Sequence, residues 1–250
     1  METKNYIEWI GTGSGLNPTL GNTSFLVGGE GERTLLVDCG FTVTPELIKK
    51  GKLKDVTDIV ITHSHADHIG GLEGLAFMNF FAFKKRGEAR PNLYIGSDEF
   101  ANNLWDYSLK GGLEKIQTEE NEPVKAILET YFKVQATQEI NIPGLPTVKL
   151  FSTPHVQGMG NYGMRIGEDI YYSGDSTSLP PADAKVIFQD CQFYESKGDV
   201  HVSYDRLKRE LPADVRAKIS LVHLGGGWDK KDPRADGFCG FVMPGDRFEF

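Results

Sequence analysis

The chain has 250 residues, of which 39% are hydrophobic and 25% charged, as is typical of a globular protein with a sizeable core. Its 35 acidic and 27 basic side chains give a net charge of −8, which argues against binding long nucleic acids through their phosphates. No apolar run is long enough for a membrane span or a signal core, and the three cysteines (Cys39, Cys191, Cys239) lack C-x-x-C spacing, so we expect a cytoplasmic protein without a membrane partner.

The first half of the chain combines predicted strands with predicted helices. Short apolar or β-branched runs predict strands at residues 5–10, 23–28, 34–38, 59–62 and 92–96. Helical patterns are found at residues 45–50, 69–83 and 97–133, the last interrupted by glycines and a proline. We therefore expect a β-rich half that is covered by helices.

The second half of the chain is mostly β in pattern. Strands are predicted near residues 147–152, 161–166, 169–173, 186–190 and 219–222. A helix is predicted at residues 203–211, and the glycines and prolines beyond residue 225 indicate loop and tail. Because there is no internal repeat or low-complexity linker, we expect a single domain over residues 1–250. Its class is α/β (α+β), with two β-rich halves packed between outer helices.

The segment after the predicted strand at 59–62 contains four potential metal ligands within six residues: His63, His65, Asp67 and His68. Imidazole and carboxylate groups together suit Zn²⁺, or Mn²⁺ and iron when oxygen ligands dominate. A loop that leaves a strand can point neighbouring side chains in different directions, so His63 and His65 could bind one metal ion while Asp67 and His68 bind another. We interpret this segment as a metal site rather than as a polar turn.

Three further candidate ligands follow other predicted strands: His155, Asp175 and His223. An isolated histidine of this kind is usually a packed or surface residue. Here the same arrangement, an apolar strand followed by a histidine or aspartate, recurs along the chain. Ligands that gather at one edge of a sheet sandwich would form a polynuclear metal site.

The order H-x-H-x-D-H, then a lone histidine, a lone aspartate and a final histidine, resembles the metallo-β-lactamase family over nearly the whole chain. The resemblance implies an αββα sandwich, in which two mixed sheets pack between outer helices. It also implies two metal sites, one formed by His63, His65 and His155, the other by Asp67, His68 and His223, with Asp175 bridging them. A complete set of this kind resembles the phosphodiesterase branch, which binds two Zn²⁺ ions; Mn²⁺ is the alternative metal.

Two segments resemble the tRNA 3′-processing endonucleases, the ribonuclease Z group: the glycine-rich residues 11–15, and Tyr194-Glu195-Ser196 followed by His201. This resemblance implies that Glu195 orients His201 beside the metal ions, with Asp67, His201 and Glu195 as catalytic residues. Tyr194 stands where the group has histidine. The loop at 18–22 lacks the group's Lys and Arg. His155 and Asp175 are only 20 positions apart, which leaves no room for the group's tRNA-clamping arm.

Length, motif order and the missing arm resemble most closely the anti-Pycsar phosphodiesterases. That resemblance implies a homodimer that hydrolyses 3′,5′-cyclic mononucleotides (cAMP, cGMP, cCMP, cUMP) to 5′-monophosphates and so counters an antiviral signal. It would act in the host cytoplasm if a phage encodes it, and no stable nucleic-acid complex is expected. Three alternatives stay open: a tRNA 3′-endonuclease without the arm, a nucleotide-sequestering protein without catalysis, and a hydrolase of the same fold acting on other esters.

Overall fold

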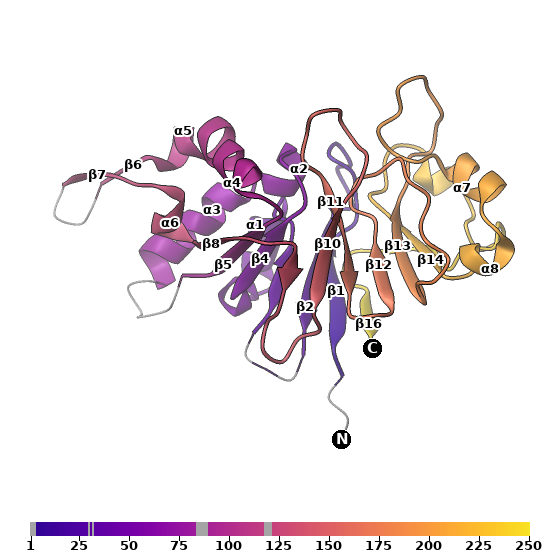
Figure 1. The fold of residues 1–250 in the computed structure, drawn as a ribbon, viewed down its shortest axis with the longest axis horizontal. Coiled ribbons are helices and arrows are strands. Elements are labelled where there is room, and N and C mark those ends of the chain that lie inside the picture. Colours follow the sequence, from indigo (N-terminus) through magenta and orange to yellow (C-terminus); the bar gives the residue numbers. More distant parts are fainter. Residues whose placement is uncertain (1–3, 30, 32, 84–89, 118–121) are drawn as a thin grey trace.

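The computed structural model describes residues 4–29, 31, 33–83, 90–117 and 122–250. Two seven-stranded sheets face each other, with helices on the outer side of each (Figure 1). The predicted αββα sandwich is thereby confirmed. Within the described residues, no helix is long and apolar enough to cross a membrane.

The first sheet comes mainly from the N-terminal half of the chain. Its strands lie in the order β16 (Arg247–Glu249), β1 (Tyr6–Gly11), β2 (Ser24–Gly28), β3 (Leu35–Val37), β4 (Asp58–Ile61), β5 (Asn92–Ile95) and β8 (Lys133–Ala136). Neighbours from β16 to β3 pair antiparallel, and those from β3 to β8 pair parallel. Its α-helices are α1 (Val43–Lys49), α2 (Ala66–Ile69), α3 (Leu72–Phe77), α4 (Asp98–Leu104), α5 (Lys110–Leu113) and α6 (Leu128–Tyr131). It also has the 3₁₀ turn η1 (Leu53–Asp55) and the π-helical segments η2 (Met78–Phe83) and η4 (Trp105–Leu109).

The second sheet repeats this plan with the C-terminal half. Its strands lie in the order β15 (Gly240–Phe241), β14 (Ile219–Val222), β13 (Val186–Asp190), β12 (Ile170–Tyr172), β11 (Tyr162–Ile166), β10 (Val148–Ser152) and β9 (Glu139–Ile140). Strands β12 to β15 pair parallel, and β9 to β12 pair antiparallel. Helices α7 (Tyr204–Glu210) and α8 (Ala213–Arg216) lie on its outer side (Figure 1), and the turn η5 (Trp228–Lys230) follows β14.

Aromatic side chains pack against one another between the two sheets. Trp9 of β1 is 1% exposed, and its ring centroid lies 4.6 Å from that of Phe25 on β2. From the opposite sheet, Phe188 of β13 and Tyr172 of β12 approach Trp9 edge-on, at 5.1 and 6.2 Å. Tilted and edge-on contacts are the favourable geometries for aromatic pairs, and large rings bury the most apolar surface. The two sheets therefore pack in a fixed relation, on which the position of the strand ends depends.

Two expectations about secondary structure hold only in part. Residues 97–133 contain α4, η4, α5 and α6, but also a hairpin formed by β6 (Lys115–Gln117) and β7 (Pro123–Lys125). Proline at the start of β7 has no amide hydrogen to continue a helix, and the polar neighbours of Ile116 leave no helical apolar stripe. The C-terminal tail is not only loop, because β15 and β16 extend one edge of each sheet. Such short strands depend on long-range pairing and leave little local pattern.

The helix predicted at 69–83 is divided. Helix α2 ends at Ile69, α3 begins at Leu72, and residues 78–83 form a π-helical turn. The break falls at a pair of glycines, Gly70 and Gly71. A Cβ atom at Gly71 would lie 2.4 Å from the carbonyl oxygen of Gly40, so only glycine permits this close approach. The break separates the short α2, which carries part of the histidine motif, from the helix packed behind it.

Asp58 at the start of β4 organises the opposite end of the first sheet. It is fully buried, and its carboxylate accepts hydrogen bonds from Arg33 Nε (2.8 Å), Thr57 Oγ1 (2.7 Å), Asn92 Nδ2 (2.8 Å) and Tyr94 Oη (3.1 Å). Buried carboxylates are tolerated when they are paired and fully hydrogen-bonded. This network joins β4 to β5 and to the segment before β3.

The substitution Asp58→Asn is expected to lower the free energy of unfolding by about 2–3 kcal/mol, because Arg33 and the other donors lose a charged acceptor. Urea-induced unfolding measures the change. Asp183→Asn is the control, since Asp183 forms an exposed ion pair with Arg165 and should matter little. Equal effects of the two substitutions would contradict the role given to Asp58.

Candidate metal centre

The predicted metal ligands all stand at one edge of the sandwich. They follow strands β4, β10, β12 and β14 in the positions His63, His65, Asp67, His68, His155, Asp175 and His223. In the second sheet, β12, β13 and β14 are parallel, and β10 has the same direction as β12 because both are antiparallel to β11. The carboxyl ends of these strands therefore meet at one edge, where they face the end of β4.

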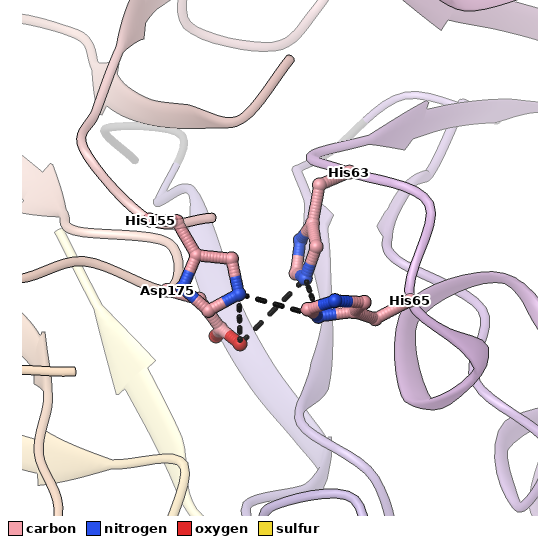
Figure 2. A group of neighbouring side chains, drawn as sticks. All are labelled: His63, His65, His155 and Asp175. Carbon is pink, nitrogen blue, oxygen red and sulfur yellow. Dashed lines mark hydrogen bonds and ion pairs between the residues drawn. The ribbon is translucent and has the colours of Figure 1, made fainter. Parts of the chain in front are cut away.

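The first group of side chains comprises His63, His65, His155 and Asp175, which point toward a common centre (Figure 2). His65 Nδ1 lies 3.0 Å from His63 Nε2 and 3.2 Å from His155 Nε2. Asp175 Oδ2 lies 3.7 Å from His63 Nε2 and 3.9 Å from His155 Nε2. Residues from both sheets thus contribute to one set of candidate ligands.

The second group comprises Asp67, His68, His223 and the same Asp175. His68 Nε2 lies 3.5 Å from Asp67 Oδ2 and 3.4 Å from Asp175 Oδ2. His223 Nε2 lies 3.3 Å from Asp67 Oδ2 and 3.4 Å from Asp175 Oδ2. The two groups therefore share one carboxylate oxygen.

Both groups fit a zinc-like ion. Ligand atoms at the edges of a tetrahedron around Zn²⁺, with bonds of about 2.0–2.1 Å, are roughly 3.3 Å apart, and the distances above cluster around that value. His68 Nε2 and Asp175 Oδ1 are buried without a hydrogen-bond partner. An unpaired buried polar atom is costly unless something else satisfies it. Imidazole nitrogen and carboxylate oxygen are the donors that Zn²⁺ and Mn²⁺ accept.

Two aspartates that were not predicted as site residues, Asp38 and Asp190, contact the side of the histidine rings that faces away from the centre. Asp38 Oδ2 lies 2.8 Å from His68 Nδ1, and the Asp38 carboxylate also accepts hydrogen bonds from Thr62 N and Oγ1. Asp190 Oδ1 lies 3.1 Å from His223 Nδ1. A partner of this kind fixes which imidazole nitrogen faces the metal. Each aspartate ends or follows an apolar strand, the signal already used for Asp175, so it could have been found.

The expected pairing of Glu195 with His201 is wrong. His201 Nδ1 lies 2.8 Å from Asp190 Oδ2, so Asp190 contacts both His201 and His223. Glu195 instead accepts a hydrogen bond from Ser203 Oγ (2.7 Å) and faces Arg209 (3.3 Å). The reason is positional: Asp190 ends the buried strand β13, whereas Glu195 lies on the exposed loop beyond it.

The His201 ring is placed beside both groups. Its centroid lies 5.0 Å from the ring centroid of His155 and 5.0 Å from that of His223. Burial would lower the pKa of His201, but the Asp190 carboxylate outweighs burial and raises the pKa above its usual value. A protonated imidazole can therefore stand next to the candidate metal ligands near neutral pH.

The ligands differ in protonation when no metal is bound. Burial lowers the pKa of His63 and of His65, so both rings are neutral and ready to bind a cation. Burial also acts to lower the pKa of His223, but the carboxylates of Asp175, Asp190 and Asp67 reverse this and raise it to about 10. Protons thus occupy positions that a metal ion would otherwise take.

Cavities open beside the centre. One of about 520 Å³ is lined by Ser64 of the histidine motif, by Ser97 and Phe100, and by Gln157, Met159 and Tyr162. Another of about 330 Å³ lies between Ser14, Leu16 and Trp228. The larger cavity is of the size usual for sites that bind small organic molecules.

The chain matches a family model described as anti-Pycsar protein Apyc1 over residues 6–248. It is 32% identical to the anti-Pycsar protein Apyc1 of Paenibacillus harenae, over 98% of this chain and 99% of that protein. It is 33% identical to the protein of the same name from Bacillus phage BSP38, over 88% of each.

Solved structures show the same fold at lower identity. The metallo-β-lactamase fold protein YhfI from Bacillus subtilis superposes with a TM-score of 0.73 at 19% identity, covering 99% of this chain and 100% of that one. The short form of human tRNase Z superposes with a TM-score of 0.65 at 17% identity, covering 97% and 98%. The metallo-β-lactamase fold predicted from the motif order is therefore confirmed.

Zinc binding is expected to release protons at pH 7. Because the pKa of His223 is raised to about 10 without metal, its ring is protonated at neutral pH and must lose that proton to bind Zn²⁺. The affinity should therefore rise with pH up to about 10 and fall as the pH is lowered. Titration calorimetry in buffers of different ionisation enthalpy counts the released protons, and His223→Asn should release fewer. Equal heats in all buffers would contradict the prediction.

Proposed function

The chain belongs to the anti-Pycsar protein Apyc1 family, and from this premise we propose that it is a metal-dependent phosphodiesterase that hydrolyses 3′,5′-cyclic mononucleotides to 5′-monophosphates. The observation that carries the proposal is the double ligand group around Asp175, with His201 and Asp190 beside it. Two adjacent cation sites and an acid–base histidine are the groups that phosphodiester hydrolysis needs.

The proposed metal assignment follows the two groups of side chains. One Zn²⁺ would be held by His63, His65 and His155, the other by Asp67, His68 and His223, with Asp175 shared between them. Mn²⁺ is the alternative, since the carboxylate oxygens also suit it. When bound, two such ions supply Lewis acidity toward phosphate oxygens and make water acidic enough to act as a nucleophile near neutral pH.

The protein's own residues would then perform distinct tasks. Asp175 Oδ2 faces imidazoles of both groups and so sets their separation. Asp67, on α2, would help to hold the ion of the site that also contains His68 and His223, and thereby fix the direction from which water attacks phosphorus. Asp190 holds His201 at Nδ1, which leaves Nε2 to carry the mobile proton. As water attacks phosphorus and the bond to the 3′ oxygen breaks, the Nε2 proton would pass to that oxygen, and the 5′-monophosphate would form. The proton lost by the attacking water would go to solvent, from which His201 would take up a proton again.

Several features favour a small substrate over RNA. His155 and Asp175 are 20 positions apart, and the segment between them is occupied largely by the hairpin of β11 and β12, without a protruding arm. The net charge of −8 opposes a long phosphate-binding surface. The 520 Å³ cavity next to Ser64 would receive the nucleoside. We therefore propose that the protein forms no stable complex with nucleic acid. We further propose that it is a single domain that acts as a homodimer in the cytoplasm, which is the host cytoplasm for a phage-encoded copy.

The test is product analysis with zinc-loaded protein and each of cAMP, cGMP, cCMP and cUMP. The expected result is 5′-monophosphate from several of them, dependent on metal, because the proposed chemistry acts on the phosphodiester and not on the base. His65→Ala should abolish turnover by removing a ligand. No product from any substrate, with metal content intact, would overturn the proposal; salt-sensitive tRNA cleavage would replace it with an RNA enzyme.

A matched pair of variants in the same assay separates proton transfer from metal binding. His201→Ala should keep its metal content and lose about 10²–10⁴-fold in kcat, the usual contribution of an acid–base group. Tyr194→Phe is the control, because Tyr194 is an exposed side chain of the neighbouring loop. Full activity in His201→Ala would remove the proton-transfer role.

A further inference from the structure

The ring of His155 is held differently from those of His68 and His223. Its Nδ1 atom lies 2.8 Å from the main-chain oxygen of Val200, 45 residues further along the chain. His68 and His223 instead face the carboxylates of Asp38 and Asp190. A carbonyl oxygen accepts but cannot donate, so His155 must donate from Nδ1 and present the lone pair of Nε2 to the centre. The orientation of His155 thus depends on the loop that carries Val200.

This loop, residues 194–200, connects β13 to α7 and is folded on itself. The Asp199 carboxylate accepts hydrogen bonds from Ser196 N, at 2.9 Å to Oδ2, and from Ser196 Oγ, at 2.5 Å to Oδ1. Gly198 between them has φ = +81°, which a residue with a side chain rarely adopts. The main-chain and hydroxyl hydrogen bonds from Ser196 also hold the pKa of Asp199 below its usual value, so the carboxylate is charged and accepting. Asp199 therefore closes a tight turn directly before Val200.

Two further contacts fix the ends of the loop. Glu195 accepts a hydrogen bond from Ser203 Oγ at 2.7 Å and forms an ion pair with Arg209 of α7. Just after Val200, Val202 N donates to the main-chain oxygen of Ser176, the residue next to Asp175. The loop is thus attached to both ends of α7, through Ser203 and Arg209, and to the segment of Asp175 through Ser176.

We propose that the loop at residues 194–200 is a positioning element for the metal site of His63, His65 and His155. Asp199 and Glu195 hold the Val200 carbonyl against His155, and so determine how tightly that site binds its ion. Glu195 is then a positioning residue rather than a catalytic one. The inference rests on the metal assignment of the proposed function, but not on the identity of the substrate.

One consequence is a difference in affinity between the two sites. A carbonyl is neutral, whereas Asp38 and Asp190 place negative charge behind His68 and His223 and strengthen those rings as ligands. Because the groups behind their histidine rings differ in charge, the two sites should differ in affinity, and a chelator should remove the two ions in separate steps.

The test is a zinc competition titration against a chromophoric chelator, with the visible spectrum of the Co²⁺-loaded protein as a second readout. Asp199→Ala should raise one of the two zinc dissociation constants, that of the site containing His155, by about 10–100-fold, the usual effect of losing a ligand's outer partner. The constant of the other site should not change. Asp199→Asn should restore part of the affinity, because its amide oxygen can still accept from Ser196 N. Lys197→Ala, an exposed side chain of the same loop, is the control.

Unchanged zinc constants and an unchanged Co²⁺ spectrum in folded Asp199→Ala would overturn the proposal. Should Asp199→Ala fail to fold, Glu195→Gln decides in the same way, because it weakens the attachment to α7 without removing the turn. Weakening of both constants equally would also overturn it, since a general loss of structure would produce that result. Failure of the proposed function is separate: a protein that follows this pattern but cleaves no cyclic nucleotide refutes only the substrate assignment.

Discussion

The structure depends on one buried carboxylate at the junction of the two sheets. Asp175 is 1% exposed, and its Oδ2 atom lies within 3.4–3.9 Å of ring nitrogens of His63, His68, His155 and His223. Together with the carboxylates of Asp67, Asp38 and Asp190 beside the same rings, it requires cations, either protons or metal ions, to balance its charge. Sharing one oxygen between two ligand groups also fixes the distance between them. The geometry of Asp175 is therefore the constraint that the remainder of the site must satisfy.

Packing at a distance from the centre supplies the required rigidity. Strands β4 and β12 belong to different sheets, so an error in sheet packing would separate His63 from Asp175. The aromatic contacts of Trp9 with Phe188 and Tyr172 oppose such a shift. The close approach of the Gly40 backbone to the histidine motif also restricts movement, because a Cβ atom at Gly40 would lie 1.9 Å from the carbonyl oxygen of Asp67. The ligands are held by the fold before any ion binds, which lowers the cost of binding.

The sandwich and its candidate metal ligands could be predicted because both leave local patterns in the sequence. Apolar strands that end in His63, His155, Asp175 or His223 can be recognised one at a time. The predicted partner of His201 was wrong because it followed the family resemblance to Glu195, although the strand signal favours Asp190, which ends the buried strand β13. The β6–β7 hairpin and the edge strand β16 were missed because their pairing lies outside the local sequence.

The most direct measurement of the central claim is anomalous X-ray diffraction from zinc-loaded crystals at the zinc absorption edge. We expect two anomalous peaks about 3.5–4 Å apart, one between His63, His65 and His155, the other between Asp67, His68 and His223, with Asp175 in contact with both. A single peak, or a peak at the neighbouring group of Asp190, His201 and His223, would contradict this expectation, because that group would then bind metal rather than move a proton.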